Sequence, residues 1–176
     1  AAIAILVLAS PFVSLAFGDN FVLAFPVVIM ISLNFYATGM RQTCITFKSA
    51  YGILIQDVHK AYIEAIVNLV VSIILVQKMG IFGVLLGTLI SNYAVAFWIE
   101  PRVLFKYGFK KKTTKYFGTY FLFMLTYVTG ALMTYWSASL VTITGFLGFV
   151  IDILLVLTIP NALVWLVWHR SQPYTQ

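Results

Sequence analysis

Long apolar runs follow one another along the whole chain, separated by short polar stretches. The runs cover about residues 1–17, 20–47, 61–78, 80–100, 116–136 and 142–168. Each is near or above the roughly 20 residues that a helix needs to cross the hydrocarbon core of a bilayer. Because only helices and closed barrels satisfy their backbone in lipid, the pattern predicts an all-α integral membrane protein. We expect about six transmembrane helices in a single membrane domain over residues 1–176.

Residues 62–91, YIEAIVNLVVSIILVQKMGIFGVLLGTLIS, form the longest of these apolar stretches. The polar turn QKMG at residues 77–80 divides it, and so short a connection makes neighbouring helices antiparallel. The stretch therefore predicts a helical hairpin whose bend lies at this turn, with Gly80 and Gly83 flanking it. After the bend, Gly83, Gly87 and Ser91 recur every four residues, a small-residue face typical of closely packed helices.

Composition agrees with a membrane location and excludes a soluble domain. Hydrophobic residues make up 62% of the chain, charged residues 9%, and the mean hydropathy is +1.00. A soluble domain carries about 25% charged residues. The single cysteine, Cys44, and two distant histidines predict neither a disulfide nor a metal site. No nucleophile or acid–base pair stands out, so we expect no enzyme and no bound cofactor.

The basic residues lie mainly on one side of the predicted membrane. The second and fourth connections and the tail hold most of them: Lys48, Lys60, Arg102, Lys106, Lys110, Lys111, Lys112, Lys115 and Arg170. Lys78 alone lies on the other side. By the positive-inside rule, both ends of this chain face the cytoplasm. The cluster KYGFKKKTTK at 106–115 lies beside a span, where topology and anionic lipid each explain it, so we expect no nucleic-acid partner.

Two neighbouring spans carry polar side chains at helical spacing. They are Glu64, Asn68 and Ser72 in one, and Asn34, Thr38 and Arg41 in the other. A charge at the centre of a membrane helix costs roughly 2.5–3.5 kcal/mol, so such residues usually face protein or water. The two stripes could line an aqueous path in which Arg41 binds an anionic group such as a phosphate. The simpler alternative is that the charges are interface anchors and that Asn68 and Ser72 hydrogen-bond to another helix.

Asp152 is an isolated charge ten residues into the last apolar run. It is a candidate proton or ion relay, a partner for a basic residue elsewhere, or a protonated and hydrogen-bonded carboxyl. A lone carboxyl does not define a pathway, which favours the last two interpretations.

The first apolar run starts at Ala1 with no basic residue before it, unlike a secretory signal peptide. We therefore expect a sequence that begins within a transmembrane helix and is a piece of a longer protein.

The order of residues in the hairpin region resembles a known family. IEAIVNLVVSIILVQKMGIFGVLLGTLIS, with Asn68 before the bend and Gly87-Thr88 after it, is similar to a helix pair of the polysaccharide repeat-unit (Wzx-type) flippases. NFYATGMRQTCITFKSAYGIL and IPNALVWLVWHR resemble the preceding span and the last span of that family. These flippases belong to the multidrug/oligosaccharidyl-lipid/polysaccharide (MATE-like) exporter superfamily. Asp152 departs from the expected pattern of the last span.

The resemblance implies a function and a set of partners. Family members move undecaprenyl-diphosphate-linked oligosaccharides across the bacterial cytoplasmic membrane for capsule, O-antigen or exopolysaccharide biosynthesis. Their fold of two pseudo-symmetric lobes implies that this chain is the carboxy-terminal part and that the amino-terminal lobe is its partner. Transport would be coupled to Na⁺ or H⁺. The resemblance makes Arg41 the first candidate to bind the diphosphate and the other five stripe residues candidates to line the path.

Three alternatives stay open. The second interpretation is a multidrug or cation antiporter of the same superfamily, which would need a cavity rich in carboxylates. The third is a membrane-embedded polysaccharide polymerase, although the predicted external connections at 17–20, 77–80 and 137–142 are too short for a catalytic region. The fourth is a membrane fragment that does not transport.

Overall fold

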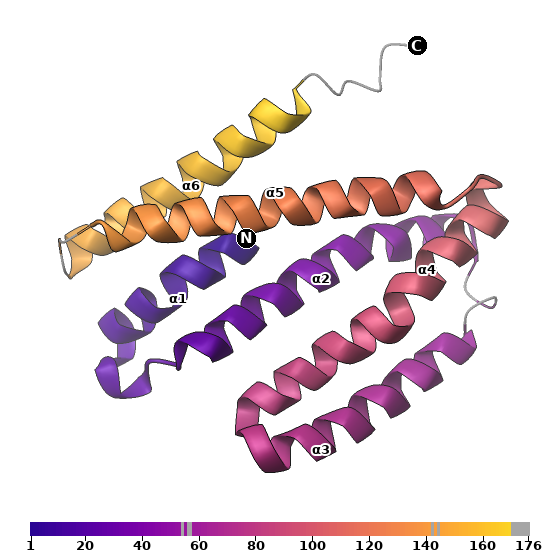
Figure 1. Ribbon diagram of the computed structural model, residues 1–176, viewed down its shortest axis with the longest axis horizontal. Helices are drawn as coiled ribbons and strands as arrows, with labels where there is room; N and C mark the ends of the chain where they lie inside the picture. Colours follow the sequence, from indigo (N-terminus) through magenta and orange to yellow (C-terminus); the bar gives the residue numbers. More distant parts are fainter. Residues whose placement is uncertain (54, 56–57, 142, 144, 170–176) are drawn as a thin grey trace. The chain divides into compact units, whose positions relative to one another are not determined.

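The computed structural model describes residues 1–53, 55, 58–141, 143 and 145–169, and all the regular secondary structure within these residues is helical, which confirms the predicted all-α class. Its helical segments are α1 (Ala2–Phe17), η1 (Asp19–Phe21), α2 (Phe25–Ala50), α3 (Val58–Ser91), η3 (Asn92–Ala96), α4 (Phe97–Val103), η4 (Leu104–Phe109), α5 (Thr114–Ser139) and α6 (Phe146–Trp168) (Figure 1). The segment η1 is a short 3₁₀ turn, while η3 and η4 are π-helical.

The chain divides into two compact units. The first comprises Ala1–Ala24 with Phe121–Gln176, and the second comprises Phe25–Tyr120. In the first unit α1 packs along α6, where the rings of Phe12 and Phe149 lie 6.2 Å apart. In the second unit α2 packs against α3 and α4. The second unit also contains both of the polar stripes that the sequence predicts.

The hairpin expected within residues 62–91 is present in the second unit. Gly80 has φ 58° and ψ −138°, a conformation that L side chains rarely adopt, and the chain reverses there. Figure 1 shows the arm of α3 that precedes Gly80 running beside the arm that follows it and leads into α4. A Cβ atom at Gly87 would lie only 2.4 Å from Ser72 Oγ, and one at Gly83 would lie 2.4 Å from Leu75 O. The small residues therefore let the arms approach closely.

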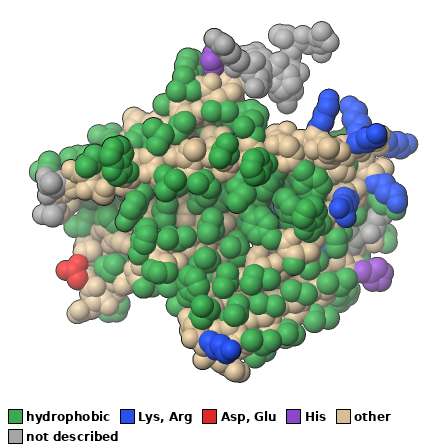
Figure 2. Space-filling view, in the orientation of Figure 1, with side chains coloured by type: hydrophobic (Ala, Val, Ile, Leu, Met, Phe, Trp, Pro, Cys, Tyr) green, Lys and Arg blue, Asp and Glu red, His purple; other side chains and the backbone are tan. Residues whose placement is uncertain are grey.

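Three of the described helices are long and apolar enough to cross a membrane: Val58–Phe109, Thr114–Ser139 and Phe146–Trp168. The first of these is 52 residues long and contains the bend at Gly80. The apolar helix α1 is shorter, with 16 residues. Hydrophobic side chains cover most of the surface drawn in Figure 2. These observations support a transmembrane protein.

Several helix ends differ from the predicted ones. Helix α2 begins at Phe25 rather than residue 20, with Pro26 in its first turn, where a missing backbone donor is tolerated. Helical structure continues past residue 100 to Phe109, and Lys48 and Lys60 also lie on helices rather than in a loop. Ion pairs satisfy some of these charges and so allow the helices to extend. Residue 142, the expected start of the last span, and Arg170 lie outside the described residues.

Candidate charged site at the hairpin

Four charged side chains meet inside the second unit, and they come from three helices. Arg41 lies on α2, Lys60 and Glu64 lie in the first two turns of α3, and Glu100 lies on α4. The four charges sum to zero. Charges withdrawn from water are tolerated when each has a partner of opposite sign and good geometry. The ion pairs of the cluster therefore connect α2, α3 and α4.

Every nitrogen of the Arg41 guanidinium donates a hydrogen bond. Its Nε donates to Glu100 Oε1 at 2.9 Å, and its Nη2 donates to Glu64 Oε2 at 2.7 Å. Its Nη1 donates to Glu64 Oε1 and to Asn92 Oδ1, the latter at 3.2 Å. Glu64 thus engages the two terminal nitrogens as a bidentate fork, the strongest geometry between arginine and a carboxylate. Glu100 accepts from Nε, the nitrogen at the inner edge of the guanidinium, where it joins the aliphatic part of the side chain.

Glu100 is the deepest member of the cluster. Its side chain is 2% exposed, against 18% for Glu64 and 23% for Arg41. The ammonium of Lys60 donates to Glu100 Oε1 and also lies 3.5 Å from Glu64 Oε2, one helical turn along α3. The buried carboxylate therefore has two cationic partners, as its removal from water requires.

The π-helical segment η3 brings Asn92 and Glu100 to the same guanidinium. In η3 the N–H of Phe97 bonds to Asn92 O, five residues back. Such a turn holds one residue more than a regular α-turn. Asn92 and Glu100 are eight residues apart, yet with this insertion they align as residues seven apart do in a regular helix, about two turns. Both can therefore contact Arg41.

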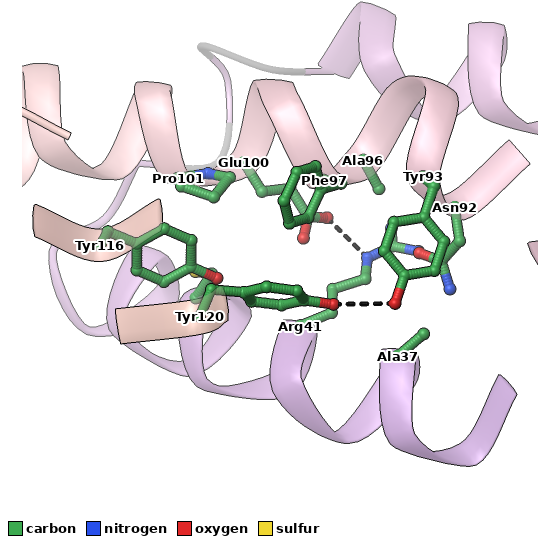
Figure 3. A pocket seen from close by; sticks show the side chains of 11 residues that line it. Ala37, Arg41, Asn92, Tyr93, Ala96, Phe97, Glu100, Pro101, Tyr116 and Tyr120 are labelled. Carbon is green, nitrogen blue, oxygen red and sulfur yellow. Dashed lines mark hydrogen bonds and ion pairs between the residues drawn. The ribbon is translucent and has the colours of Figure 1, made fainter. Parts of the chain in front are cut away.

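Arg41 lines two separate spaces. One is an open hollow of about 490 Å³ lined by Arg41, Lys60, Ala61, Glu64, Ala65, Asn68 and Leu69. The other is a small cavity of about 20 Å³ between Arg41, Glu100 and a group of aromatic side chains (Figure 3). A space of that size holds about one water molecule. The guanidinium therefore lies between a wide, accessible hollow and a narrow internal space.

The small cavity is bordered by hydroxyl groups as well as rings. The hydroxyls of Tyr93 and Tyr120 lie 3.0 Å apart, and the Cys44 thiol donates to the Tyr116 hydroxyl at 3.4 Å. In Figure 3 the tyrosine rings stand around the Arg41 side chain, which points toward Glu100. These polar groups are satisfied mainly by one another, which suits a packed interior better than a transport path.

The six predicted path residues divide into three groups. Arg41 and Glu64 bond to each other, and Asn68 lines the same hollow. Ser72 donates to Asn68 Oδ1 at 3.2 Å and packs against Gly87, so it lies in the contact between the hairpin arms.

The remaining two predicted residues lie elsewhere on α2. Asn34 donates to Leu85 O at 3.0 Å, across to the second arm of the hairpin. Thr38 is exposed and lines neither space. The sequence offered helix-to-helix hydrogen bonding as an alternative for Asn68 and Ser72. Asn68 Nδ2 lies 3.5 Å from Thr88 Oγ1 on the second arm, whereas Ser72 donates to Asn68 on its own arm.

Asp152 lies in α6, which belongs to the first unit, whereas the four charged residues of the cluster belong to the second unit. Its Oδ1 is buried and has no hydrogen-bond partner within the described part of the chain. Gly148, one turn earlier, is buried against Ile143 O. Among the described residues, no three His, Cys, Asp or Glu side chains gather closely enough to hold a metal ion.

Sequence reasoning did not select Lys60, Asn92 or Glu100 as site residues. Two signals were present. Lys60 and Glu64 are four residues apart, the spacing of an ion pair on one helix face. Glu100 is a carboxylate at the end of an apolar run, where a buried charge demands a partner. Asn92 gave no comparable signal, because its approach to Arg41 depends on the π-turn.

The chain matches no family model, no curated protein and no solved structure. The chemistry of the cluster and the hollow is therefore the basis on which its function has to be argued.

Proposed function

We propose that the chain is part of a transporter that flips undecaprenyl-diphosphate-linked oligosaccharide repeat units across the bacterial cytoplasmic membrane. In this proposal it spans the membrane about six times and contributes to one lobe of a MATE-like, two-lobed exporter. The observation that carries the proposal is the open hollow beside Arg41, which is lined by the partly exposed Arg41 and by the more deeply buried Lys60.

Flipping a lipid-linked sugar requires two different surfaces on one protein. The sugar and the diphosphate need a hydrated, polar path, while the prenyl chain stays in the hydrocarbon. The first arm of the hairpin offers both. Glu64 and Asn68 line the hollow, whereas Ile66 and Ile73 are large exposed apolar side chains of the same arm.

The charges that line the hollow favour an anionic cargo. Arg41 and Lys60 contribute two positive charges, and Glu64 contributes one negative charge. Arginine binds phosphate through a bidentate fork, and lysine binds it as a point charge. A cationic drug would instead need a surface dominated by carboxylates. The hollow therefore supports the flippase proposal over the antiporter alternative.

The test is complementation of polymer export in cells that lack the protein. Arg41→Ala should lower surface polymer by about tenfold or more, because a hydrogen-bonded charged contact is worth roughly 1.5–3 kcal/mol. Arg41→Lys keeps the charge and loses the fork, so export should also fall. Arg102→Ala, which removes an exposed arginine 5.6 Å from the Trp98 ring centroid, is the matched control and should export normally.

Membrane levels of each variant are measured in the same cells. Wild-type polymer yield from both Arg41 variants, at equal membrane levels, would contradict the proposed function.

A further inference from the structure

We propose that Glu64 is an internal competitor for the diphosphate: it occupies the phosphate-binding edge of Arg41 until an anion entering the hollow displaces it toward Lys60. This inference deepens the proposed transport function and rests on it for the identity of the cargo.

The two carboxylates of the cluster hold different edges of the same guanidinium. Glu100 accepts from Nε of Arg41 at 2.9 Å and is 2% exposed, so it faces the interior. Glu64 accepts from Nη1 and Nη2 and is 18% exposed. The terminal pair of nitrogens is the edge that recognises carboxylate and phosphate oxygens alike. An anion therefore needs the place that Glu64 holds.

The hollow gives access to this edge and not to the inner one. Arg41, Lys60 and Glu64 line it, whereas Glu100 lines the small inner cavity and not the hollow. A diphosphate arriving through the hollow meets Arg41 from the side of Glu64. Glu100 keeps its contacts with Arg41 and with Lys60, and so holds the guanidinium in position.

Lys60 is placed to receive the displaced carboxylate. Its ammonium already lies 3.5 Å from Glu64 Oε2, one helical turn away on α3. Glu64 therefore retains a cationic partner after it leaves Arg41, and the exchange does not strand a buried charge. The arriving anion in turn replaces the negative charge that Arg41 loses. The net result is one anion exchanged for another at the terminal edge of the guanidinium.

Binding measurements on the purified full chain in detergent test this exchange. The probes are pyrophosphate, which carries the headgroup chemistry alone, and farnesyl diphosphate, which presents it on a prenyl chain. Glu64→Gln should lower the dissociation constant of both probes by about tenfold, the scale of one charge-assisted contact. A larger gain for farnesyl diphosphate assigns the site to a lipid headgroup, and an equal gain assigns it to free diphosphate.

Glu64→Asp is the matched variant. The shorter side chain keeps the negative charge near Lys60 but cannot reach both terminal nitrogens of Arg41. Competition predicts tighter binding for Glu64→Asp as well, whereas a general charge effect predicts tighter binding for Glu64→Gln only. Arg41→Lys, which removes the fork, should remove the gain in a double variant with Glu64→Gln.

The proposal is overturned if Glu64→Asp, checked for folding by its helical melting curve, binds either probe no more tightly than the wild type. Failure of the competitor proposal and failure of the transport proposal give different results. Export that depends on Arg41, together with unchanged binding by the Glu64 variants, would remove the competitor and leave the transporter. Tighter binding by the Glu64 variants, together with export that does not depend on Arg41, would support the competitor and contradict the proposed transport function.

Discussion

Arg41 carries a permanent charge within α2, and its surroundings explain how that charge is tolerated. Glu64, Glu100 and Asn92 together accept hydrogen bonds from each of its nitrogens. A charge that has left water keeps its stability only while such partners remain. The cluster is therefore as sensitive to the loss of a carboxylate as to the loss of the arginine.

Glu100→Gln should destabilise the second unit more than any change at an exposed charge. Its side chain is 2% exposed and serves both Arg41 and Lys60, so its neutralisation leaves a buried excess of positive charge. Breaking one partner of a buried pair costs about 3–5 kcal/mol. Unfolding of the purified protein in detergent should occur at a clearly lower temperature. Lys78→Gln, at an exposed position beside the bend, is the control. Equal unfolding temperatures for Glu100→Gln and the wild type would show that the pairing contributes little.

At this scale the sequence revealed half of the cluster. Arg41 and Glu64 stood out because a charge within an apolar run is rare and costly. The sequence did not show that the two bind each other, because that depends on how α2 packs against α3. It also suggested that Arg41 was free for an anion, whereas all its nitrogens already donate hydrogen bonds.

The hairpin is the element that sets the depth and spacing of the site. Its two arms can lie close together only where the residues between them are small, and Gly83 and Gly87 are both buried in that contact. Ser72 meets Gly87 one turn after Asn68, so the arm contact fixes the side of α3 that faces the hollow.

Gly87→Ala should therefore separate the arms. The added Cβ would lie 2.4 Å from Ser72 Oγ and 3.0 Å from Ser72 Cα, and overpacking of this kind costs about 1–3 kcal/mol. Gly118→Ala, on α5, is the control, since nothing lies within 4 Å of its Cβ. Thermal unfolding in detergent should separate the two variants. The close packing is refuted if Gly87→Ala unfolds at or above the temperature of Gly118→Ala.

The sequence indicated which segments form helices. It did not indicate where the helices end or which way side chains face after the π-turn. The turn QKMG, which ends at Gly80, indicated the bend, because glycine takes positive φ more readily than other residues. The π-turn at Asn92–Ala96 has no such marker. It adds one residue to a turn and rotates everything after it, which is why the alignment of Asn92 with Glu100 escaped a count based on regular helical spacing.

The molecule as a whole combines a largely apolar exterior with a polar hollow in its second unit. In the part of the chain that the structure describes, three helices are long and apolar enough to cross a membrane, and the four clustered charges are paired within the second unit. The transport proposal requires that the hollow contains water while the opposite face of the same arm contacts lipid.

Cysteine accessibility measures the contrast directly. Two variants, Asn68→Cys and Ile66→Cys, each combined with Cys44→Ala, place a single thiol at nearly the same depth along α3. Asn68 lines the hollow, whereas Ile66 is an apolar side chain that is 63% exposed. A water-soluble maleimide reacts with the thiolate, which forms in water and not in hydrocarbon. In opened membranes we expect rapid labelling of Asn68→Cys and no labelling of Ile66→Cys. Equal labelling of the two, or labelling of Ile66→Cys alone, would contradict the transport proposal.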